Sequence, residues 1–363
     1  MSTKPITPQG SKPSRQFGAH SCAFCTIIPP HMTDHIIKHG DDEIRSRMME
    51  TMRMTEQFRG IRGIMGNIPA LAVSTGQKRR TVYDARQDTA LPGRLVRGEG
   101  SRPSRDIAVN EAYEGAGATY DLYNQVYQRN SVDDQGLRID STVHFDVQYD
   151  NAFWNGNQMV YGDGDGQLFN RFTIAIDVIG HELTHGVVQF EAGLQYRNES
   201  GALNESFADV FGSLVKQRSL NQTADQADWL IGAGLLAPGV NGQGLRSLKA
   251  PGTAYDDPNL GQDPQPAHYD DRYQGRQDNG GVHINSGIPN QAFYLAAIAI
   301  GGFAWEKAGR IWYVALRDVL RSRSTFSSAA DATIRVAGNL YGQNSIEQKA
   351  VRDAWQAVGV IRS

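Results

Sequence analysis

The sequence His-Glu-Leu-Thr-His at residues 181–185 constrains the fold of this chain more than any other stretch. It lies within residues 173–190, where apolar residues recur every three or four positions, a spacing that predicts a helix. Two imidazoles four residues apart project from one face of a helix and can bind one metal ion. Leu183, Val187 and Phe190 form a separate apolar stripe. We therefore expect a helix that is anchored in the core while its histidines face a cleft.

Catalytic zinc is held by three protein ligands and keeps one position for water. His181 and His185 supply two, and the next predicted helix carries Glu205 and Asp209 one turn apart. One of these carboxylates can bind zinc while the other accepts a hydrogen bond from a ligating histidine. Glu182 is too close to the histidines in sequence to join them as a ligand, but it can take a proton from a metal-bound water. The pattern favours a hydrolytic zinc site over a solvated helix with two surface histidines.

The rest of the chain divides into a strand-rich first part and a mainly helical second part. Short runs typical of strands occur at 81–84, 142–147 and 158–161, with a helical pattern at 110–128 between them. Later apolar spacing predicts helices at 173–190, 202–218, 288–300, 303–320, 327–340 and 346–358. We therefore predict an α+β protein of two domains, with the histidine helix between them.

The composition excludes several classes of protein. With 40% hydrophobic residues, 21% charged residues and a net charge of -3, the chain is typical of a soluble globular protein and gives no reason to expect nucleic acid as a partner. No stretch approaches the roughly 18 consecutive apolar residues of a membrane span. Residues 1–20 lack the apolar core of a secretory signal, which predicts a cytoplasmic protein or export by a route other than Sec. The only cysteines, Cys22 and Cys25, favour a pair of free thiols over a metal pair or a redox motif.

From about Val82 to Val360 the sequence resembles the thermolysin family of metallopeptidases. The motifs that carry the resemblance, besides the histidine helix, are Tyr83-Asp84-Ala85, Asn151-Ala152-Phe153-Trp154-Asn155-Gly156, Tyr161 to Gly166, Gly201-Ala202-Leu203-Asn204-Glu205 and Asp278 to Gly287. The resemblance implies a zinc endopeptidase that is made as a precursor with a short propeptide, as in the protealysin-like branch. A zinc protein that recognises peptides without cutting them is the alternative. A casein assay with and without a chelator separates the two.

The resemblance also implies roles for individual residues. The zinc ligands would be His181, His185 and Glu205, the general base Glu182, and the residues that orient the ligands Asp209 and Asn204. Tyr196 and His283 would stabilise the oxyanion, and Asp278 would hold His283. Asn151 and Ala152 would bind the substrate backbone, and Arg246 a substrate carbonyl. A pocket for a bulky apolar residue just after the scissile bond would be lined by Phe169, Phe172, Val178 and Leu245. These roles make chemical sense, because amide hydrolysis needs hydrogen-bond donors aimed at the developing negative charge, and an apolar pocket selects an apolar side chain.

The family's paired calcium site is expected to be absent. Asp177 and Asp228 match two of its carboxylates, but the other three fall on Lys216, Leu230 and Ala233. Calcium needs six to eight oxygen ligands, and an ammonium group opposes its binding. Lys216 is instead expected to pair with Asp177.

Residues 1–70 are predicted to form a leader and an inhibitory propeptide, followed by catalytic domains at 71–190 and 191–363. We expect helices within 33–62, and the portion from Cys22 to Met32 in the substrate cleft, where His31 or a thiolate could approach the zinc. The alternative is a disordered tail with a helical appendage. Self-cleavage is predicted before a bulky apolar residue, at Asn67-Ile68 or, preferably, Ala70-Leu71. Family resemblance slightly favours a secreted enzyme.

Overall fold

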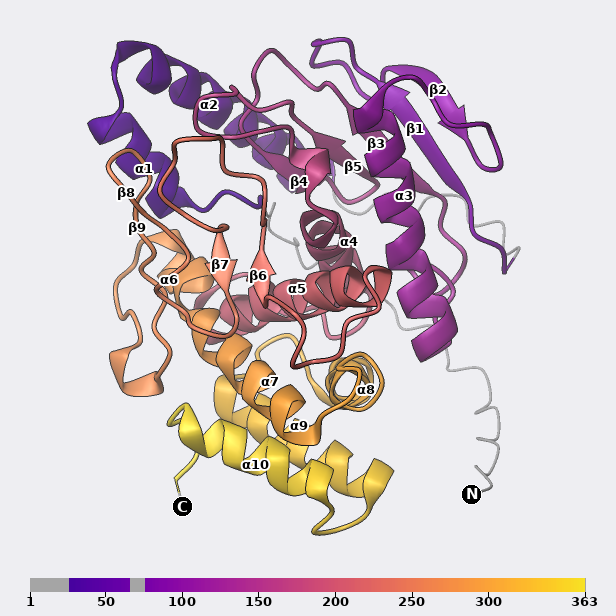
Figure 1. Ribbon diagram of the computed structural model, residues 1–363, viewed down its shortest axis with the longest axis vertical. Helices are drawn as coiled ribbons and strands as arrows, with labels where there is room; N and C mark the ends of the chain where they lie inside the picture. Colours follow the sequence, from indigo (N-terminus) through magenta and orange to yellow (C-terminus); the bar gives the residue numbers. More distant parts are fainter. Residues whose placement is uncertain (1–25, 66–75, 363) are drawn as a thin grey trace.

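The computed structural model describes residues 26–65 and 76–362 (Figure 1). The helices are α1 (Pro30–His39), α2 (Asp42–Met65), α3 (Ile107–Asp121), α4 (Ile176–Phe190), α5 (Asn198–Ser219), α6 (Asp278–Asn285), α7 (Gly287–Ile300), α8 (Ala308–Val314), α9 (Phe326–Tyr341) and α10 (Ile346–Ala357). The strands are β1 (Arg80–Asp84), β2 (Arg94–Gly98), β3 (Ile139–Val143), β4 (Ala152–Trp154), β5 (Gln158–Tyr161), β6 (Leu230–Ile231), β7 (Arg246–Ser247), β8 (Asp256–Asp257) and β9 (Gly261–Gln262). The predicted α+β class is confirmed.

The first half of the chain is built on a five-stranded sheet of order β2-β1-β3-β5-β4. β3 runs parallel to both β1 and β5, while β2 and β4 pair antiparallel at the two edges. Helix α3 packs against β1 and β3 on one face. The short edge strand β4 packs against α4, the helix that carries His181 and His185, which brings Asn151 and Ala152 near this helix.

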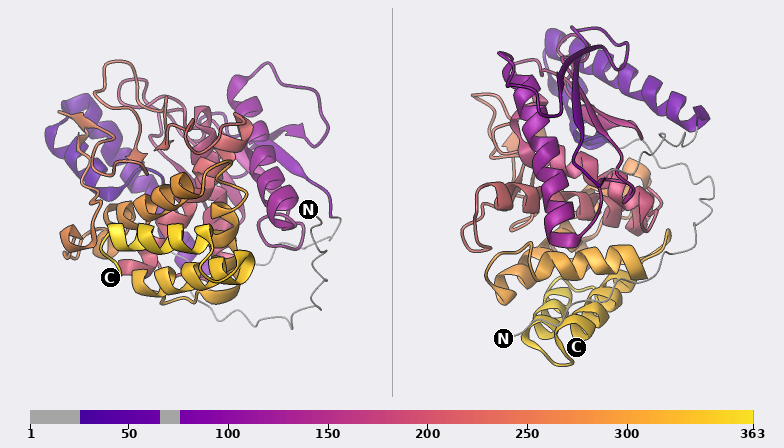
Figure 2. Two further views of the ribbon diagram at one scale, coloured as in Figure 1. Left: turned by 60° about the horizontal axis from the view of Figure 1, so that its bottom comes forward. Right: turned by 90° about the vertical axis from the view of Figure 1, so that its right-hand side faces the viewer.

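Side chains of β4 and β5 alternate between two apolar layers, as the pleat of a strand requires. Trp154 and Met159 join the main core, whereas Phe153 and Val160 form a second cluster with Met54 of α2. Helix α2 therefore covers the face of the sheet opposite the main core. The two further views show it running beside the sheet (Figure 2).

Two glycines allow α4 and α5 to pack closely. A Cβ atom on Gly212 would lie 2.4 Å from the Asp177 carbonyl oxygen, and one on Gly180 would lie 3.0 Å from the Cα atom of Gly212. Because only glycine fits at such a crossing, the two backbones can approach until side chains one or two turns away meet. This contact places the acidic residues of α5 against the histidine face of α4.

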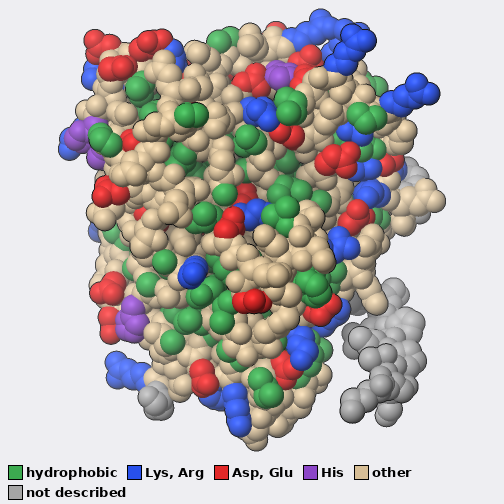
Figure 3. Space-filling view, in the orientation of Figure 1, with side chains coloured by type: hydrophobic (Ala, Val, Ile, Leu, Met, Phe, Trp, Pro, Cys, Tyr) green, Lys and Arg blue, Asp and Glu red, His purple; other side chains and the backbone are tan. Residues whose placement is uncertain are grey.

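The second half is mainly helical, as predicted. Helices α7, α8, α9 and α10 form the lower layer in Figure 1, and α7 and α10 pack on each other. No described helix is long and apolar enough to cross a membrane. Acidic and basic side chains are interspersed over the face shown in Figure 3, consistent with the small net charge.

The expected N-terminal helices are present but begin and end at different residues. Helix α1 begins at Pro30, where the fixed φ of proline suits the first helical position, and not at Thr33, which lies inside the helix. Asp41 caps α2, since its Oδ1 accepts hydrogen bonds from the backbone N–H groups of Glu43 and Ile44. The helices are not merely surface elements, because Met32 of α1 is fully buried.

Candidate metal centre and substrate cleft

Three potential metal ligands meet where α4 crosses α5. His181, His185 and Glu205 are buried, and one ligand atom from each lies within 4.8 Å of the others. The two histidine Nε2 atoms are 3.0 Å apart, and each lies 3.5 Å from an oxygen of Glu205. Among the described residues this is the one such cluster of three or more metal-binding side chains.

These distances fit a zinc ion. With ligand bonds of about 2.0–2.1 Å in a tetrahedron, neighbouring ligand atoms lie roughly 3.3 Å apart. The Oε2 atom of Glu205 is buried and accepts no hydrogen bond from the described residues. Burial lowers the pKa of His181 to about 4 and that of His185 to about 3, so both imidazoles are neutral at pH 7. Neutral imidazole and an ionised carboxylate are the forms that bind zinc.

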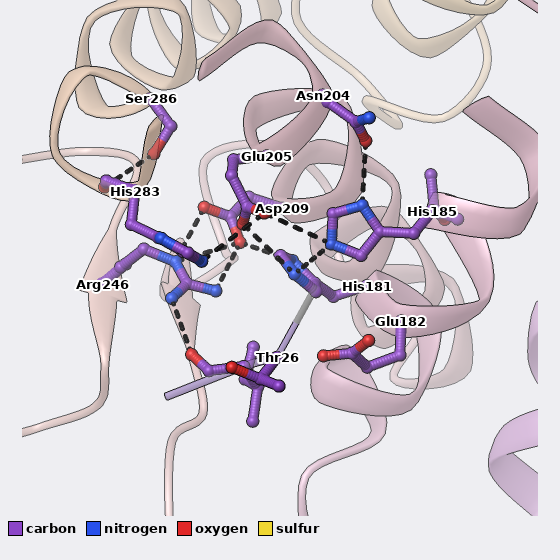
Figure 4. Close-up of polar contacts among 12 residues, drawn as sticks. Thr26, His181, Glu182, His185, Asn204, Glu205, Asp209, Arg246, His283 and Ser286 are labelled. Atoms are coloured by element: carbon purple, nitrogen blue, oxygen red, sulfur yellow. Dashed lines mark hydrogen bonds and ion pairs between the residues drawn. The ribbon is translucent and has the colours of Figure 1, made fainter. Parts of the chain in front are cut away.

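Each ligating ring is oriented by a residue of α5. His181 Nδ1 lies 2.8 Å from Asp209 Oδ1, and His185 Nδ1 lies 2.9 Å from Asn204 Oδ1. Both contacts leave Nε2 of the histidine directed at the cluster (Figure 4). Burial would raise the pKa of Asp209, but Arg246 and His181 outweigh it and hold that pKa well below its usual range.

Glu182 lies on the same turn of α4 as the histidines but its carboxylate points to another side of the cleft (Figure 4). The side chain is fully buried, and its Oε2 accepts a hydrogen bond of 3.1 Å from the backbone N–H of Trp154 in β4. A carboxylate held beside the ligands, and not among them, is placed to exchange protons with a water molecule at the metal.

A second group of polar side chains lies across the cleft. Tyr196 Oη donates to Glu205 Oε1 and is 2.9 Å from His283 Nε2. Asp278 is 2.6 Å from His283 Nδ1 and accepts the backbone N–H of the same residue. Burial would lower the pKa of His283, but Asp278 and Glu205 raise it to about 8. The described geometry thus brings together Tyr196 and His283, which the resemblance assigned to the oxyanion, and Asp278, which it assigned to hold His283.

The expected substrate-binding residues contact the chain's own N-terminal segment. Ile27 N–H donates to the carbonyl oxygen of Ala152 over 3.2 Å, and Ile28 N–H donates to Asn151 Oδ1 over 3.2 Å. Arg246 Nη1 donates to the carbonyl oxygen of Ile27, also over 3.2 Å. Residues 26–28 therefore pair with the edge strand β4 as an added strand.

The four residues expected to line the apolar pocket belong to the same large buried core as Ile27, whose side chain is fully inaccessible. The rings of Phe169 and Phe172 lie 5.9 Å apart in this core. Val178 and Leu245 are equally buried.

Two further expectations about the N-terminal segment have different outcomes. His31 does not join the cluster of potential metal ligands among the described residues, because its Nε2 lies 3.1 Å from Tyr255 Oη. Cys22 and Cys25 and both candidate cleavage bonds lie outside the described residues. Sequence reasoning also missed Tyr255, for which no motif gives a signal.

Lys216 takes the position expected of it. Its Nζ lies 2.7 Å from Asp177 Oδ2, 2.9 Å from Asp228 Oδ1 and 2.7 Å from the carbonyl oxygen of Leu230. Burial would lower the pKa of Lys216, but Asp177 and Asp228 outweigh it and raise the pKa.

The chain is similar to protein families and to individual proteins that are already known. Residues 71–189 match the model of the thermolysin metallopeptidase catalytic domain, and residues 192–360 match that of the thermolysin metallopeptidase alpha-helical domain. An extracellular metalloprotease of Pectobacterium carotovorum is 53% identical over 93% of this chain and 96% of its own length. The thermostable neutral protease of Geobacillus stearothermophilus is 45% identical over 77% of this chain and 50% of its own length. The solved structure of the protealysin precursor from Serratia proteamaculans superposes with a TM-score of 0.86 at 52% identity, covering 93% of this chain and all of that one.

Proposed function

The chain belongs to the thermolysin family of zinc metallopeptidases, and from this premise we propose how its own residues cut a peptide bond. The observation that carries the proposal is the placement of Glu182 beside a zinc-binding cluster whose cleft already holds an extended backbone. The hydrogen bonds of residues 27 and 28 with Asn151, Ala152 and Arg246 support the proposal that a substrate is held by the same three residues.

In the proposed mechanism, Glu182 takes a proton from the attacking water and delivers it to the leaving nitrogen. When bound by His181, His185 and Glu205, zinc lowers the pKa of that water and polarises the scissile carbonyl. Tyr196 Oη and protonated His283 donate hydrogen bonds to the carbonyl oxygen as it gains negative charge. Those donors are worth most in a buried cleft, because the low local dielectric strengthens each hydrogen bond.

The position of Ile27 also supports a preference for substrates with a bulky apolar residue after the scissile bond. The N–H of Ile27 donates a hydrogen bond to Ala152, its carbonyl oxygen accepts one from Arg246, and its side chain is buried in the apolar core. By this register, the bond presented to the metal site is Thr26–Ile27. Adding or removing one methylene from the residue in such a pocket changes selectivity by roughly 10- to 200-fold.

Glu182→Ala is expected to retain zinc and to lose hydrolysis. The change deletes the base and keeps all three ligands, so metal content stays near one ion per chain while kcat/KM for casein or a peptide falls by about two to four orders of magnitude. Metal analysis and a peptide assay on the same preparation measure both quantities. The exposed Glu306→Ala variant is the control. Activity above a few per cent in a zinc-replete Glu182→Ala protein would remove Glu182 from the role of base.

We further propose that residues 1–70 are an intramolecular inhibitor, with catalytic domains at 71–190 and 191–363. The segment from Thr26 to Ile28 fills the position of a substrate, and α1 and α2 attach it to both halves of the enzyme. The similarity to a protein solved as a precursor supports this proposal. The similarity to an extracellular protease supports export of the processed enzyme.

Ile27→Asp is expected to release this inhibition. A carboxylate cannot be buried in the apolar pocket without a large desolvation cost, so the segment leaves the cleft. The full-length variant should hydrolyse a fluorogenic peptide from the first minute, while wild type shows a lag that ends when mass spectrometry detects processing. Met49→Asp, on the exposed side of α2, should keep the lag. Once processed, all three proteins should have equal kcat/KM, and an unshortened lag in Ile27→Asp would contradict autoinhibition.

A further inference from the structure

A buried amide in α7 contacts the residue that orients a zinc ligand. Asn290 is fully buried, and its Nδ2 donates to Asp209 Oδ2 over 2.9 Å. Asp209 Oδ1 meets His181 Nδ1, and the Arg246 guanidinium bonds both oxygens at 2.9–3.1 Å. Asp209 thus stands between the metal ligand and the arginine that holds the Ile27 carbonyl.

The two oxygens of Asp209 have different tasks. Oδ1 faces His181 and sets the direction of its ring, whereas Oδ2 receives Arg246 Nε and Asn290 Nδ2. Arg246 contacts both oxygens, and His181 contacts the oxygen labelled Oδ1. Asn290 adds a hydrogen bond to the oxygen that does not face His181, and so helps to hold the plane of the carboxylate against the ring.

Asn290 is held by the same corner of the chain that carries His283. Its backbone N–H donates to the carbonyl oxygen of Ser286, whose Oγ in turn donates to the carbonyl oxygen of His283. Gln265 Nε2 donates to that same carbonyl oxygen and to Ser286 Oγ. Hydrogen bonds through Ser286 and Gln265 thus connect the backbone of His283 to that of Asn290 at the α6–α7 corner.

We propose that Asn290 is a positioning residue of the hydrolytic site, acting through Asp209 on the orientation of His181. This inference rests on the proposed function, in which His181 is a zinc ligand. It adds Asn290 to the site as a residue that contacts neither the metal nor the substrate. Since residues that orient zinc ligands carry about 10- to 100-fold effects on metal affinity or activity, a residue one bond further away should have an effect near the lower end, about tenfold.

The test compares two buried amides that are alike except for their partner. Gln217 in α5 is also fully buried, donates through Nε2 to Ser213 over 3.0 Å, and has a carbonyl oxygen without a hydrogen bond from the described residues, as does Asn290. Replacing either amide by leucine removes one buried hydrogen bond and puts a branched apolar side chain in the place of the amide. Loss of general stability should therefore be similar in Asn290→Leu and Gln217→Leu.

Four proteins are compared in their processed forms: wild type, Asn290→Leu, Asn290→Ser and Gln217→Leu. For each, we measure kcat, KM and the rate at which zinc is released after excess chelator is added. Asn290→Leu should release zinc about tenfold faster and lose kcat by a similar factor with KM changed less than twofold. Asn290→Ser, which keeps a donor, should lie between it and wild type, and Gln217→Leu should match wild type. Wild-type zinc release and kcat in Asn290→Leu would overturn the proposal, as would equal effects in Gln217→Leu. Failure of the proposed function itself would appear instead as a wild-type protein without zinc-dependent hydrolysis.

Discussion

Lys216 forms a buried ion pair at the position where the family resemblance predicted the loss of a calcium site. Its ammonium group lies among two carboxylates and a carbonyl oxygen, and its side chain is only 9% exposed. Asp177 is 1% exposed and also accepts the backbone N–H of Gly232. One positive charge fixed on the chain therefore lies between the two carboxylates.

Lys216→Met is expected to destabilise the protein strongly, because it leaves the Asp177 carboxylate buried without its partner. Removing one member of a buried ion pair costs about 3–5 kcal/mol of unfolding free energy. The control Lys307→Met breaks the Lys307–Glu347 pair, in which the lysine is 50% exposed, and should cost about 0–1 kcal/mol. Denaturant unfolding in the Glu182→Ala background, where self-digestion cannot interfere, measures both.

The same background tests the calcium expectation. If Lys216 serves in place of the calcium ion, calcium should not bind at this site in the Glu182→Ala protein that keeps Lys216. Millimolar calcium should then leave its melting temperature nearly unchanged, since a ligand stabilises only the state that binds it. A large rise in melting temperature with calcium, or equal unfolding midpoints for Lys216→Met and Lys307→Met, would contradict this account.

At the scale of elements, α1 places the partly buried His31 near His283, Asp278 and Arg246. Nδ1 of His31 is buried and has no hydrogen-bond partner among the described residues, while Nε2 meets Tyr255 Oη. Burial lowers the pKa of His31 to about 4, with further lowering by His283 and Arg246 and an opposing contribution from Asp278. The docked helix therefore favours a neutral ring.

Acid is expected to loosen α1 from the cleft. The ordinary histidine pKa is about 6.5, so docking is at full strength above pH 6.5 and weakens by up to about tenfold per pH unit as the pH falls toward 4. Hydrogen exchange of residues 26–39 in the intact Glu182→Ala chain, corrected for the intrinsic rate, should increase between pH 7 and pH 5. The interval from pH 7 to pH 5 lies above the pKa values of His181 and His185, which are about 4 and about 3.

The matched variants separate His31 from other titrating groups. His31→Phe keeps a ring of similar size without a titrating nitrogen, so its exchange should no longer depend on this pH change. His39→Phe alters an exposed histidine of the same helix and should behave as wild type. Equal acid sensitivity in His31→Phe would show that another group drives the loosening.

At the scale of the whole molecule, the N-terminal segment joins the two halves. Thr26 bridges to Phe153 of the sheet, while Arg246 of β7 holds the carbonyl oxygen of Ile27. Helix α1 packs near β9, and α2 covers the free face of the sheet. The segment thus contacts both halves of the chain and buries apolar surface on each of them.

The sequence by itself determined the long helices, the strands that alternate clearly, and the pair of histidines on one helix face, while the choice of Glu205 over Asp209 as third ligand came from the family resemblance. The first three follow from local periodicity and spacing, such as the four positions from His181 to His185. It did not predict β4 as a separate strand or α6, in which Asn279, Gly280 and Gly281 have positive φ before the helix carries His283. A left-handed turn has no apolar period for a sequence pattern to show.

Only the tertiary structure decided how distant residues act together. Gly180 and Gly212 set the approach of α4 and α5 that brings Glu205 to the histidines, although neither glycine has a functional side chain. The contact of Asn290 with Asp209 joins residues 81 positions apart, and that of His31 with Tyr255 joins residues 224 apart. Such pairs depend on the packing of whole helices, and the physical reason they escape sequence reasoning is that a hydrogen bond formed across the fold leaves no periodic trace in either segment.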